Sequence, residues 1–541
     1  MMSERYDYVV VGAGTAGCVL AARLSEAPDV RVLLVEAGGR EPLPESKVPS
    51  AWPQLQGSSM DWADQALPFA GTGSTMTWPG GRGLGGSSMI NATSFLRGHR
   101  SSYDAWAAGG AEGWGFDDLL PFFRRSEAFV GRDPRLRGTE GPLTPAPVAT
   151  PHPLSRAALA AAEELGYPVV SDPNNGVEEG FGYCDLNIVG QQRQSAVHAY
   201  LGPALTRPNL TVITDSVVEH LLLEDDRCTG VRYRPSEAHV ATEPPGRSES
   251  DGTRRVYAER EVVLAAGALG SPALLLSSGI GPAKQLQVAG VPTLHDRPGV
   301  GANLHDHPMS GVVYRSARPV PPAAPDSNGG GEIKGLLRAL PDSTMPDLQM
   351  FTAITPMVSR TLPGPDRGAG YNIMIALMLP RSRGSVRLAP AHTGSSGRRS
   401  LLIEAGYYQE RRDLDVMAAG LDTAREFGAS PAFDEWRREQ VQPRPGTLDR
   451  REIHDYLRRS LATYFHYAGT CRMGTDAMAV VDLALRVRGV SGLRVVDASV
   501  MPAPVSANTN ATVYAIAERA AELISRPVDA VAVSTDQYSP E

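Results

Sequence analysis

Three glycines and one acidic residue near the start of the chain have the types and spacing of a phosphate-binding turn. Gly12, Gly14 and Gly17 follow an apolar run at 6–11, and Glu36 ends a second apolar run nineteen positions after Gly17. Glycines permit a tight turn and let a pyrophosphate approach the backbone, and the N–H groups at the start of the following helix can bind phosphate oxygens. Because an acid at position 36 can bind ribose hydroxyls and disfavours a 2′-phosphate, we predict a site for FAD or NAD rather than NADP.

Alternating strands and helices must position these residues. The runs at 6–11 and 30–35 are typical of buried strands on either side of a helix, and a second alternating region covers roughly 209–282. The region between about 335 and 460 instead combines strand-like runs with longer helical stretches. The pattern predicts an α/β fold in which an α+β lobe interrupts a nucleotide-binding domain.

Composition and charge exclude several classes of function. The 541 residues carry a net charge of −8, from 52 basic and 60 acidic side chains, whereas nucleic-acid binding needs a basic face. The sequence contains no run of about 18 apolar residues, so we expect no membrane span. The first residues lack the pattern of a secretory signal, and the four cysteines are too widely spaced for a disulfide framework or a metal pair. We therefore expect a cytoplasmic protein.

Three polar stretches have too few large apolar residues to form a core. They are 235–254, the Pro- and Gly-rich segment 317–332, and the tail from Pro527. Two interpretations of 317–332 stay open, a flap over a site or a surface loop, and its composition favours the surface loop.

Five further segments stand at intervals along the chain: 83–94 (GLGGSSMINATS), 267–282 (GALGSPALLLSSGIGP), 299–308 (GVGANLHDHP), 466–474 (HYAGTCRMG) and 496–511 (VDASVMPAPVSANTNA). Together with the glycine turn, in this order and spacing, they resemble the glucose–methanol–choline (GMC) family of flavin oxidoreductases. The resemblance extends over most of the chain. It implies alcohol oxidation with FAD bound by a discontinuous Rossmann-like domain and an α+β substrate-binding lobe.

The resemblance also implies where the cofactor lies. We expect an FAD-binding domain formed by 1–155, 206–310 and 465–530, a substrate-binding domain formed by 156–205 and 311–464, and a tail at 531–541. The expected FAD contacts are Gly12, Gly14, Thr15, Ala16, Gly17, Glu36, Ala37, Gly86, Asn91, Ala92, Thr93, Ser94, Val218, Asp497 and Ala498. Met89 stands where some family members carry a histidine that tethers the flavin, so we expect non-covalent FAD.

Oxidation of an alcohol by a flavin requires a base and a hydrogen-bond donor. The base takes the hydroxyl proton while hydride passes from carbon to flavin N5, and the donor stabilises charge on the oxygen. Histidine and asparagine suit these roles. His466 and Asn510 match the family's base and its partner. A lone histidine would be interpreted as a core residue, but the place of His466 ahead of 469–474 favours the role of base. Asn510 is expected to open the last helix, with its N-terminus facing the flavin.

The residues before the histidine give the only indication of the substrate. Tyr464 and Phe465 are expected to wall the pocket, which favours a primary, apolar or aromatic alcohol, although two core aromatics would give the same pattern. No acidic residue matches a cation-binding role, so choline is not favoured. The expected electron acceptor is O2 or a quinone-type compound, which leaves both oxidase and dehydrogenase open.

Two alternative functions compete with alcohol oxidation. One is a non-catalytic nucleotide-binding or scaffold protein, which ranks last because it would need no base and donor beside the cofactor. A family member with a hydroxynitrile lyase or light-driven decarboxylase reaction would use its flavin differently, but the presence of both His466 and Asn510 favours oxidation. His305, Asp306 and His307 could be interpreted as metal ligands. Because no third ligand cluster accompanies them, we expect no metal site.

Overall fold

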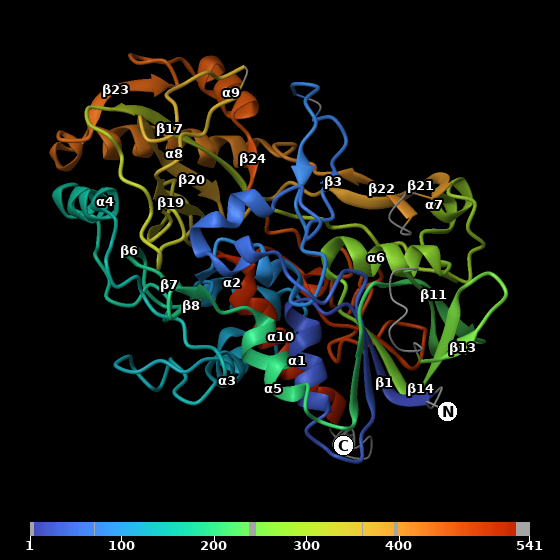
Figure 1. The fold of residues 1–541 in the computed structure, drawn as a ribbon. Coiled ribbons are helices and arrows are strands. Elements are labelled where there is room, and N and C mark those ends of the chain that lie inside the picture. The colour runs from blue at the N-terminus through green and yellow to red at the C-terminus, as the bar shows by residue number, and fades with distance from the viewer. Residues whose placement is uncertain (1–4, 70, 237–244, 360, 394–398, 526–541) are drawn as a thin grey trace, which may run out of the picture.

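Two β-sheets organise the chain (Figure 1). The computed structural model describes residues 5–69, 71–236, 245–359, 361–393 and 399–525. The first sheet has the order β10 (Leu210–Ile213), β2 (Val32–Val35), β1 (Arg5–Val11), β14 (Arg254–Leu264), β12 (Arg227–Pro235) and β11 (Ser216–Glu224), and β25 (Leu493–Val495) also pairs with β14. Strands β10, β2, β1, β14 and β25 are parallel, whereas β11 and β12 are antiparallel.

The parallel strands are buried on both sides, as their continuous apolar runs require. Helix α1 (Thr15–Leu24) follows β1 directly and lies beside α10 (Thr509–Ser525), the last described helix (Figure 1). Helix α6 (Gly267–Ser277) follows β14 in the same manner. Three helices therefore begin at the carboxyl ends of parallel strands or close to them, where nucleotides bind in open α/β sheets.

The second sheet is antiparallel. Its order is β23 (Arg437–Gln442), β17 (Pro308–Ser316), β20 (Gly370–Leu377), β19 (Leu348–Ala353), β18 (Ile333–Leu337) and β6 (Gly180–Tyr183), and β24 (Ala462–Thr463) also pairs with β17. Helix α8 (Arg411–Ala429) packs on this sheet through Leu414, Met417, Leu421 and Ala424, a helical spacing of apolar residues. The predicted α/β class with an α+β lobe is confirmed.

Smaller elements connect the two sheets. The remaining described α-helices are α2 (Arg100–Ala108), α3 (Phe116–Ser126), α4 (Pro153–Glu164), α5 (Gly202–Ala204), α7 (Ala283–Val288) and α9 (Arg450–Arg459). The remaining strands pair as β3 (Asp64–Gln65) with β4 (Thr77–Trp78), β5 (Ser94–Phe95) with β7 (Asp185–Leu186), β8 (Ile188–Val189) with β9 (Gln192–Arg193), β15 (Ile280–Gly281) with β16 (His295–Asp296), and β21 (Ser385–Thr393) with β22 (Arg399–Glu404). Strand β13 (Arg247–Ser248), within the 235–254 stretch, pairs with β14.

The domain boundaries stay a proposal, and one of them moves. Strand β6 belongs to the second sheet, as the assignment of 156–205 to the substrate domain requires. However, Ala196, Tyr200 and Ala204 pack in the core of the first sheet, and Tyr200 stacks on Tyr514 of α10 at 5.7 Å. We therefore place this boundary near residue 190. The predicted tail at 531–541, residues 526–530 and the 237–244 part of the 235–254 stretch lie outside the described residues.

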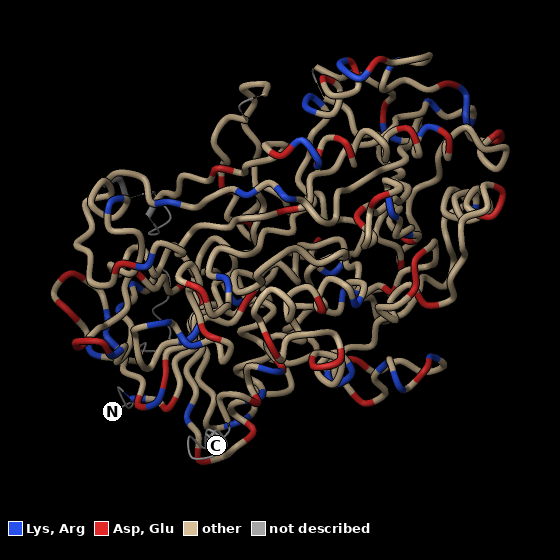
Figure 2. Tube along the Cα trace, turned by 180° about the vertical axis from the view of Figure 1, so that it is seen from behind, with Lys and Arg blue, Asp and Glu red and all other residues tan. Residues whose placement is uncertain are grey.

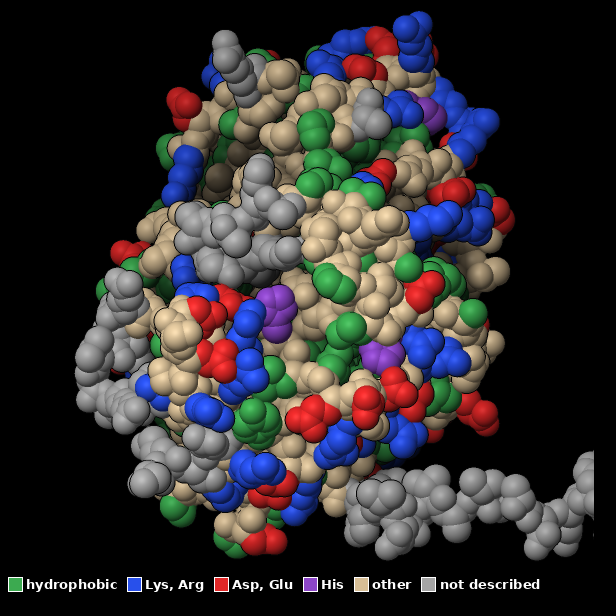
Figure 3. All heavy atoms as spheres, turned by 90° about the vertical axis from the view of Figure 1, so that its right-hand side faces the viewer, with side chains coloured by type: hydrophobic (Ala, Val, Ile, Leu, Met, Phe, Trp, Pro, Cys, Tyr) green, Lys and Arg blue, Asp and Glu red, His purple; other side chains and the backbone are tan. Residues whose placement is uncertain are grey.

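The surface is mixed in charge. Figure 2 shows basic and acidic segments interspersed along the chain, and the face in Figure 3 likewise mixes charged and apolar side chains. All four cysteines are buried and free. Within the described ranges, no helix combines the length and apolar character needed to span a bilayer.

Candidate active site

A cavity of about 910 Å³ lies where the two sheets meet. The ends of β1 and β2, strand β11 and the first turns of α1, α6 and α10 line one part of it. The second sheet contributes Met309, Lys334, Phe351, Ala353, Asn372 and Met374. The cavity therefore joins the predicted nucleotide site to a pocket in the other lobe.

The glycine turn has the shape that its sequence predicts. Gly12 has a φ of +98°, and a Cβ on Gly17 would lie 1.8 Å from the carbonyl oxygen of Gly12, so α1 can dock on the turn only because residue 17 is glycine. A Cβ on Gly14 would instead have its nearest neighbour 3.9 Å away, because this residue faces the cavity. No side chain caps the start of α1, which leaves its N–H groups available to an anion.

Glu36 ties this turn to the neighbouring segment. One carboxylate oxygen accepts the Ala13 N–H at 2.7 Å, and the other accepts those of Gly38 at 2.8 Å and Gly83 at 3.0 Å. The side chain is buried at the cavity wall, and burial raises its pKa. A carboxylate has about four acceptor positions, so one remains for a ribose hydroxyl.

Most of the predicted site residues line the cavity. They are Gly12, Gly14, Thr15, Ala16, Glu36, Ala37, Gly86, Asn91, Ala92, Ser94, Val218, Tyr464, Phe465, His466, Asp497, Ala498 and Asn510. Gly17 and Thr93 are not part of the lining, since Gly17 packs under the turn and Thr93 is fully buried. Contact of these residues with a cofactor stays a prediction.

Ile90, rather than the expected Met89, faces the cavity in the segment where some family members carry a flavin tether. Met89 packs with Leu55, Met60 and Ile90 in a small apolar cluster and does not line the cavity, whereas Ile90 does. The isoleucine side chain has no nucleophilic atom. The expected lack of a histidine tether therefore depends on Ile90 rather than Met89.

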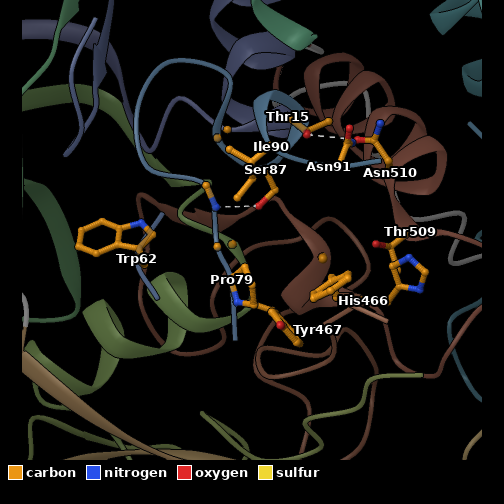
Figure 4. Close-up of a pocket in the computed structure, with 18 of the residues that line it drawn as sticks. Thr15, Trp62, Pro79, Ser87, Ile90, Asn91, His466, Tyr467, Thr509 and Asn510 are labelled. Carbon is orange, nitrogen blue, oxygen red and sulfur yellow. Dashed lines mark hydrogen bonds between the residues drawn. The ribbon is translucent and has the colours of Figure 1, made fainter. Parts of the chain in front are cut away.

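The partner of His466 is Asn508, not Asn510. Nδ2 of Asn508 lies 3.1 Å from Nε2 of His466, while Oδ1 of Asn510 pairs with the Thr15 hydroxyl at 3.3 Å. Figure 4 shows His466 near Thr509, and Asn510 turned towards Thr15. The physical reason is the start of α10: because the helix begins at Thr509, residue 508 precedes it and residue 510 points back to α1. The predicted pairing of His466 with Asn510 is corrected accordingly.

His466 is held from both sides of its ring. Its Nδ1 lies 2.8 Å from Nδ1 of His307, whose pKa burial lowers to about 3. An amide nitrogen can only donate, so Nε2 of His466 accepts from Asn508 and the proton resides on Nδ1, which donates to His307. Burial, followed by the neighbouring His307 and Lys334, lowers the pKa of His466 well below its usual value. The imidazole is therefore neutral at pH 7 and keeps its basic nitrogen beside Asn508.

Asp306 fixes the segment that carries the histidine. Its Oδ1 accepts the backbone N–H of His466 at 2.7 Å, and its Oδ2 accepts the hydroxyls of Tyr407 and Thr463. Phe465 adopts a φ of +65°, which is uncommon for a residue with a side chain. This turn directs Phe465 and His466 into the same cavity.

Aromatic rings wall the pocket beside His466. The ring of Tyr464 lies 4.4 Å from that of His466 and stacks on Phe351 at 5.4 Å, measured between centroids. Phe465 meets Trp52 edge to face at 6.1 Å. The expectation that Tyr464 and Phe465 face the pocket agrees with this lining. Separately, in the described parts of the chain no group of three or more His, Cys, Asp or Glu side chains could hold a metal ion.

Sequence reasoning missed three residues of this pocket. Asn508 could have been found by placing the helix start one residue earlier, since it stands two positions before Asn510. Lys334 and Trp52 had no local signal, because the pairing of β18 and the fold of 49–55 bring them to the cavity.

Comparisons with known proteins identify the family. Models of the GMC oxidoreductase family match residues 6–309 and 380–517. The chain belongs to the GMC oxidoreductase family. Among its GMC relatives, pyridoxine 4-oxidase of Microbacterium luteolum is 36% identical over 95% of this chain and 98% of that protein. The mitochondrial choline dehydrogenase of Homo sapiens is 35% identical over 96% of this chain and 90% of that one.

A solved structure supports the same assignment. The crystal structure of pyridoxine 4-oxidase from Mesorbium loti is 37% identical, covers 96% of this chain and 98% of its own, and superposes with a TM-score of 0.88. The protein is thus a GMC-type alcohol oxidase or dehydrogenase that depends on FAD.

The cavity fits this cofactor. Uncapped N–H groups at α1 suit a pyrophosphate, and the Gly14 cradle would be filled by any Cβ. At the other end, Asn508 Oδ1 and Asn510 Nδ2 are buried and have no hydrogen-bond partner in the described part of the chain. An acceptor and a donor left open at the start of α10 suit a polar ring system and a substrate hydroxyl.

Proposed function

We propose that the protein oxidises a primary alcohol carried on an apolar or aromatic group, with His466 as the base. The observation that carries this proposal is the contact of 3.1 Å between His466 and Asn508 on the cavity wall. A neutral histidine beside an uncharged amide is the pair that removal of a hydroxyl proton requires.

Each residue has a role that follows from its contacts. In the substrate complex the hydroxyl replaces the Asn508 amide at Nε2 of His466. Nε2 takes the hydroxyl proton, and Nδ1 stays hydrogen-bonded to His307 while the ring becomes charged. The Asn508 amide donates to the substrate oxygen as negative charge develops there. Bound FAD supplies the hydride acceptor, flavin N5. Asp306 keeps the backbone of His466 in place, and the rings of Tyr464 and Phe351 exclude water from the pocket.

The walls of the pocket favour an aromatic substrate. Pyridoxine and choline are the compounds named for two relatives, one with an aromatic ring and one a quaternary ammonium. Ring surfaces are offered by Tyr464, Phe465, Phe351 and Trp52, and the described residues of the second sheet place no carboxylate at the cavity. An aromatic primary alcohol therefore suits this chain better than choline does.

The remaining parts of the function follow from the same site. We propose that FAD is bound non-covalently, since Ile90 has no nucleophilic atom, and that O2 or a quinone-type compound reoxidises it. Stopped-flow mixing of the reduced enzyme with air distinguishes these acceptors: reoxidation as fast as turnover identifies an oxidase, and slow reoxidation a dehydrogenase. A lyase or light-driven decarboxylase is the alternative, and it predicts no reduction of the flavin by any alcohol.

Anaerobic reduction of the bound flavin tests the base. Benzyl alcohol and related primary alcohols are mixed with the enzyme, and loss of the oxidised-flavin absorbance is followed. His466→Ala should slow this step at least about a hundredfold, since a general base contributes about 10²–10⁴. His454→Ala on α9, away from the cavity lining, is the control and should react at the wild-type rate. A near-normal rate in His466→Ala would refute the assignment.

The same assay separates the two asparagines. Asn508→Ala removes the donor beside His466 and should slow flavin reduction about tenfold or more. Asn510→Ala removes a contact between α10 and α1 and should chiefly weaken FAD retention. If Asn510→Ala slowed the reduction of fully loaded enzyme more than Asn508→Ala did, the reassignment to Asn508 would be wrong.

A further inference from the structure

Lys334 is a buried cation in the substrate part of the cavity. It is one of three lysines in the chain, and it is 5% exposed on β18. Register places it opposite Phe351 of β19, which in turn lies opposite Met374 of β20, and all three line the cavity. The ammonium therefore belongs to the face of the second sheet that is turned towards the pocket.

Among the described residues, the contacts of this ammonium are with neutral groups. It donates to the Tyr464 hydroxyl and lies 3.5 Å from Gln349 Oε1, and it lies 4.7 Å and 5.1 Å from the ring centroids of Phe351 and Tyr464. Among the described side chains, no carboxylate forms a salt bridge with Lys334, and its third N–H has no partner. The acid closest in sequence, Glu332, instead accepts the His152 N–H at 2.8 Å.

Another buried cation of this chain is treated differently. Arg137 is fully buried, but Glu127, Asp172 and Asp185 surround it at 2.7–2.8 Å. A buried charge without a counterion costs free energy, so such a residue is explained best when a ligand supplies the missing charge. Lys334 lacks the compensation that Arg137 has, and it faces a cavity that a substrate enters.

The charge of the surrounding wall agrees with an anionic ligand. The acidic residues of the cavity are Glu36, Glu219 and Asp497, on the nucleotide side, and Asp64 on β3. Among the described residues, Lys334 is the one charged group that the second sheet contributes to the lining. The exposed Arg367 adds another cation, and Arg234 lines the nucleotide side. These cations would repel a quaternary ammonium, whereas no described acidic side chain of the second sheet would repel an anion there.

Tyr464 connects this cation with the base. Its hydroxyl accepts from Lys334, and its ring lies 4.4 Å from that of His466. Building on the proposed function, we propose that Lys334 binds a negatively charged oxygen of the substrate, so that the substrate is a primary alcohol whose scaffold carries a carboxylate or a phenolate. The hydroxymethyl group then lies at His466 and the anionic oxygen at Lys334, with the intervening scaffold against Tyr464 and Phe351.

Binding of unreactive analogues to the holoenzyme tests this inference without turnover. Two pairs are titrated while the absorbance of bound FAD is followed: benzoate against benzamide, and pentafluorophenol, ionised at neutral pH, against pentafluorobenzene. The wild type should bind at least one anion about tenfold or more tightly than its neutral partner, as a charge-assisted hydrogen bond implies. The pair with the larger ratio identifies the carboxylate or the phenolate.

Substitutions assign that preference to Lys334. Lys334→Met should abolish it, and Lys334→Gln provides the same test if the methionine variant does not retain FAD. Lys284→Met, an exposed lysine on α7, is the matched control and should keep it. Equal affinity for anion and neutral analogue in the wild type, or a preference that persists without Lys334, would overturn the inference. Failure of the His466 proposal would appear separately, as normal flavin reduction in His466→Ala.

Discussion

His466 takes up a proton less readily than an exposed histidine, because its surroundings disfavour a second positive charge. Burial has the largest effect on its pKa, and His307 and the Lys334 ammonium add to it. The Asp306 carboxylate, which would favour the charged ring, accepts the backbone N–H of His466 instead. The base therefore stays neutral at pH values at which a free imidazole would already be protonated.

This environment predicts how activity depends on pH. Because the pKa of His466 is depressed, kcat/KM should remain constant as the pH falls through 6.5 and should decline only below that value. Lys334→Met removes one of the positive charges that lower this pKa, so its decline should begin at a higher pH than in the wild type. The profile is measured with a neutral alcohol, which avoids titration of the substrate.

Two outcomes would contradict this explanation. A wild-type decline that is centred at or above pH 6.5 would mean that the base is not depressed. An unchanged pH profile in Lys334→Met would show that the charge of Lys334 does not lower the pKa of His466. Asp306, which holds the backbone of His466, has a pKa that burial raises to about 6, so it also titrates in this pH range. Asp306→Asn therefore controls for a decline caused by protonation of that carboxyl.

At the scale of elements, the first turns of α1 and α10 meet at the cavity. The Thr15 hydroxyl donates to Asn510 Oδ1 at 3.3 Å, which links the two helix starts. Each start presents N–H groups and a partial positive charge. The position of α1 depends on Gly17, where a Cβ would lie 1.8 Å from the Gly12 carbonyl oxygen.

Alanine at two glycines of the same turn should therefore have different effects. Gly17→Ala forces α1 away from β1, so it should lower the free energy of unfolding of the apoprotein by about 1–3 kcal/mol, as overpacking does, and weaken FAD binding as well. Gly14→Ala has space within the protein but fills the phosphate cradle, so it should weaken FAD binding only. Thermal unfolding without FAD and titration with FAD measure both effects. Equal apoprotein stability in the two variants would contradict the packing argument.

The contrast between turn and pocket shows what sequence can predict. The turn at Gly12–Gly17 and the acid at position 36 were predictable because their constraints act between residues close in the chain. The partner of His466 was not, because Asn508 and Asn510 differ only in their position relative to the start of α10. Lys334 reaches the pocket through strand pairing between residues far apart, for which the local sequence gives no signal. The parallel sheet followed from its apolar runs. The 196–204 segment instead joined the first core through contacts with α1 and through Tyr200, which stacks on Tyr514 of α10.

At the scale of the whole molecule, segments from the start, middle and end of the chain converge on one cavity. Glu36 accepts an N–H from Gly83, Asp497 accepts those of Gly267 and Ser499, and Asn303 donates to the Gly469 and Pro502 carbonyls. Of these residues, Glu36, Gly267 and Asp497 line the cavity. A cofactor that binds there contacts all three parts of the chain at once, so its binding is coupled to the stability of the whole fold.

Removal of FAD should therefore be reversible and should destabilise the protein. Acid precipitation should leave the yellow colour in the supernatant, because Ile90 provides no atom for a covalent bond.

The apoprotein should unfold at a lower temperature, and FAD at about 100 times its Kd should restore about 2.7 kcal/mol of stability. ADP is the control ligand, because it fills only the nucleotide part of the cavity and leaves the start of α10 uncontacted. Two ligands at the same multiple of their own Kd stabilise a protein equally, so ADP and FAD are compared at equal concentration. At equal concentration, FAD should stabilise more because it also contacts the residues around Asn510. Colour that stays in the pellet would show a covalent bond, and equal stabilisation by ADP and FAD would show that the flavin end contributes no binding.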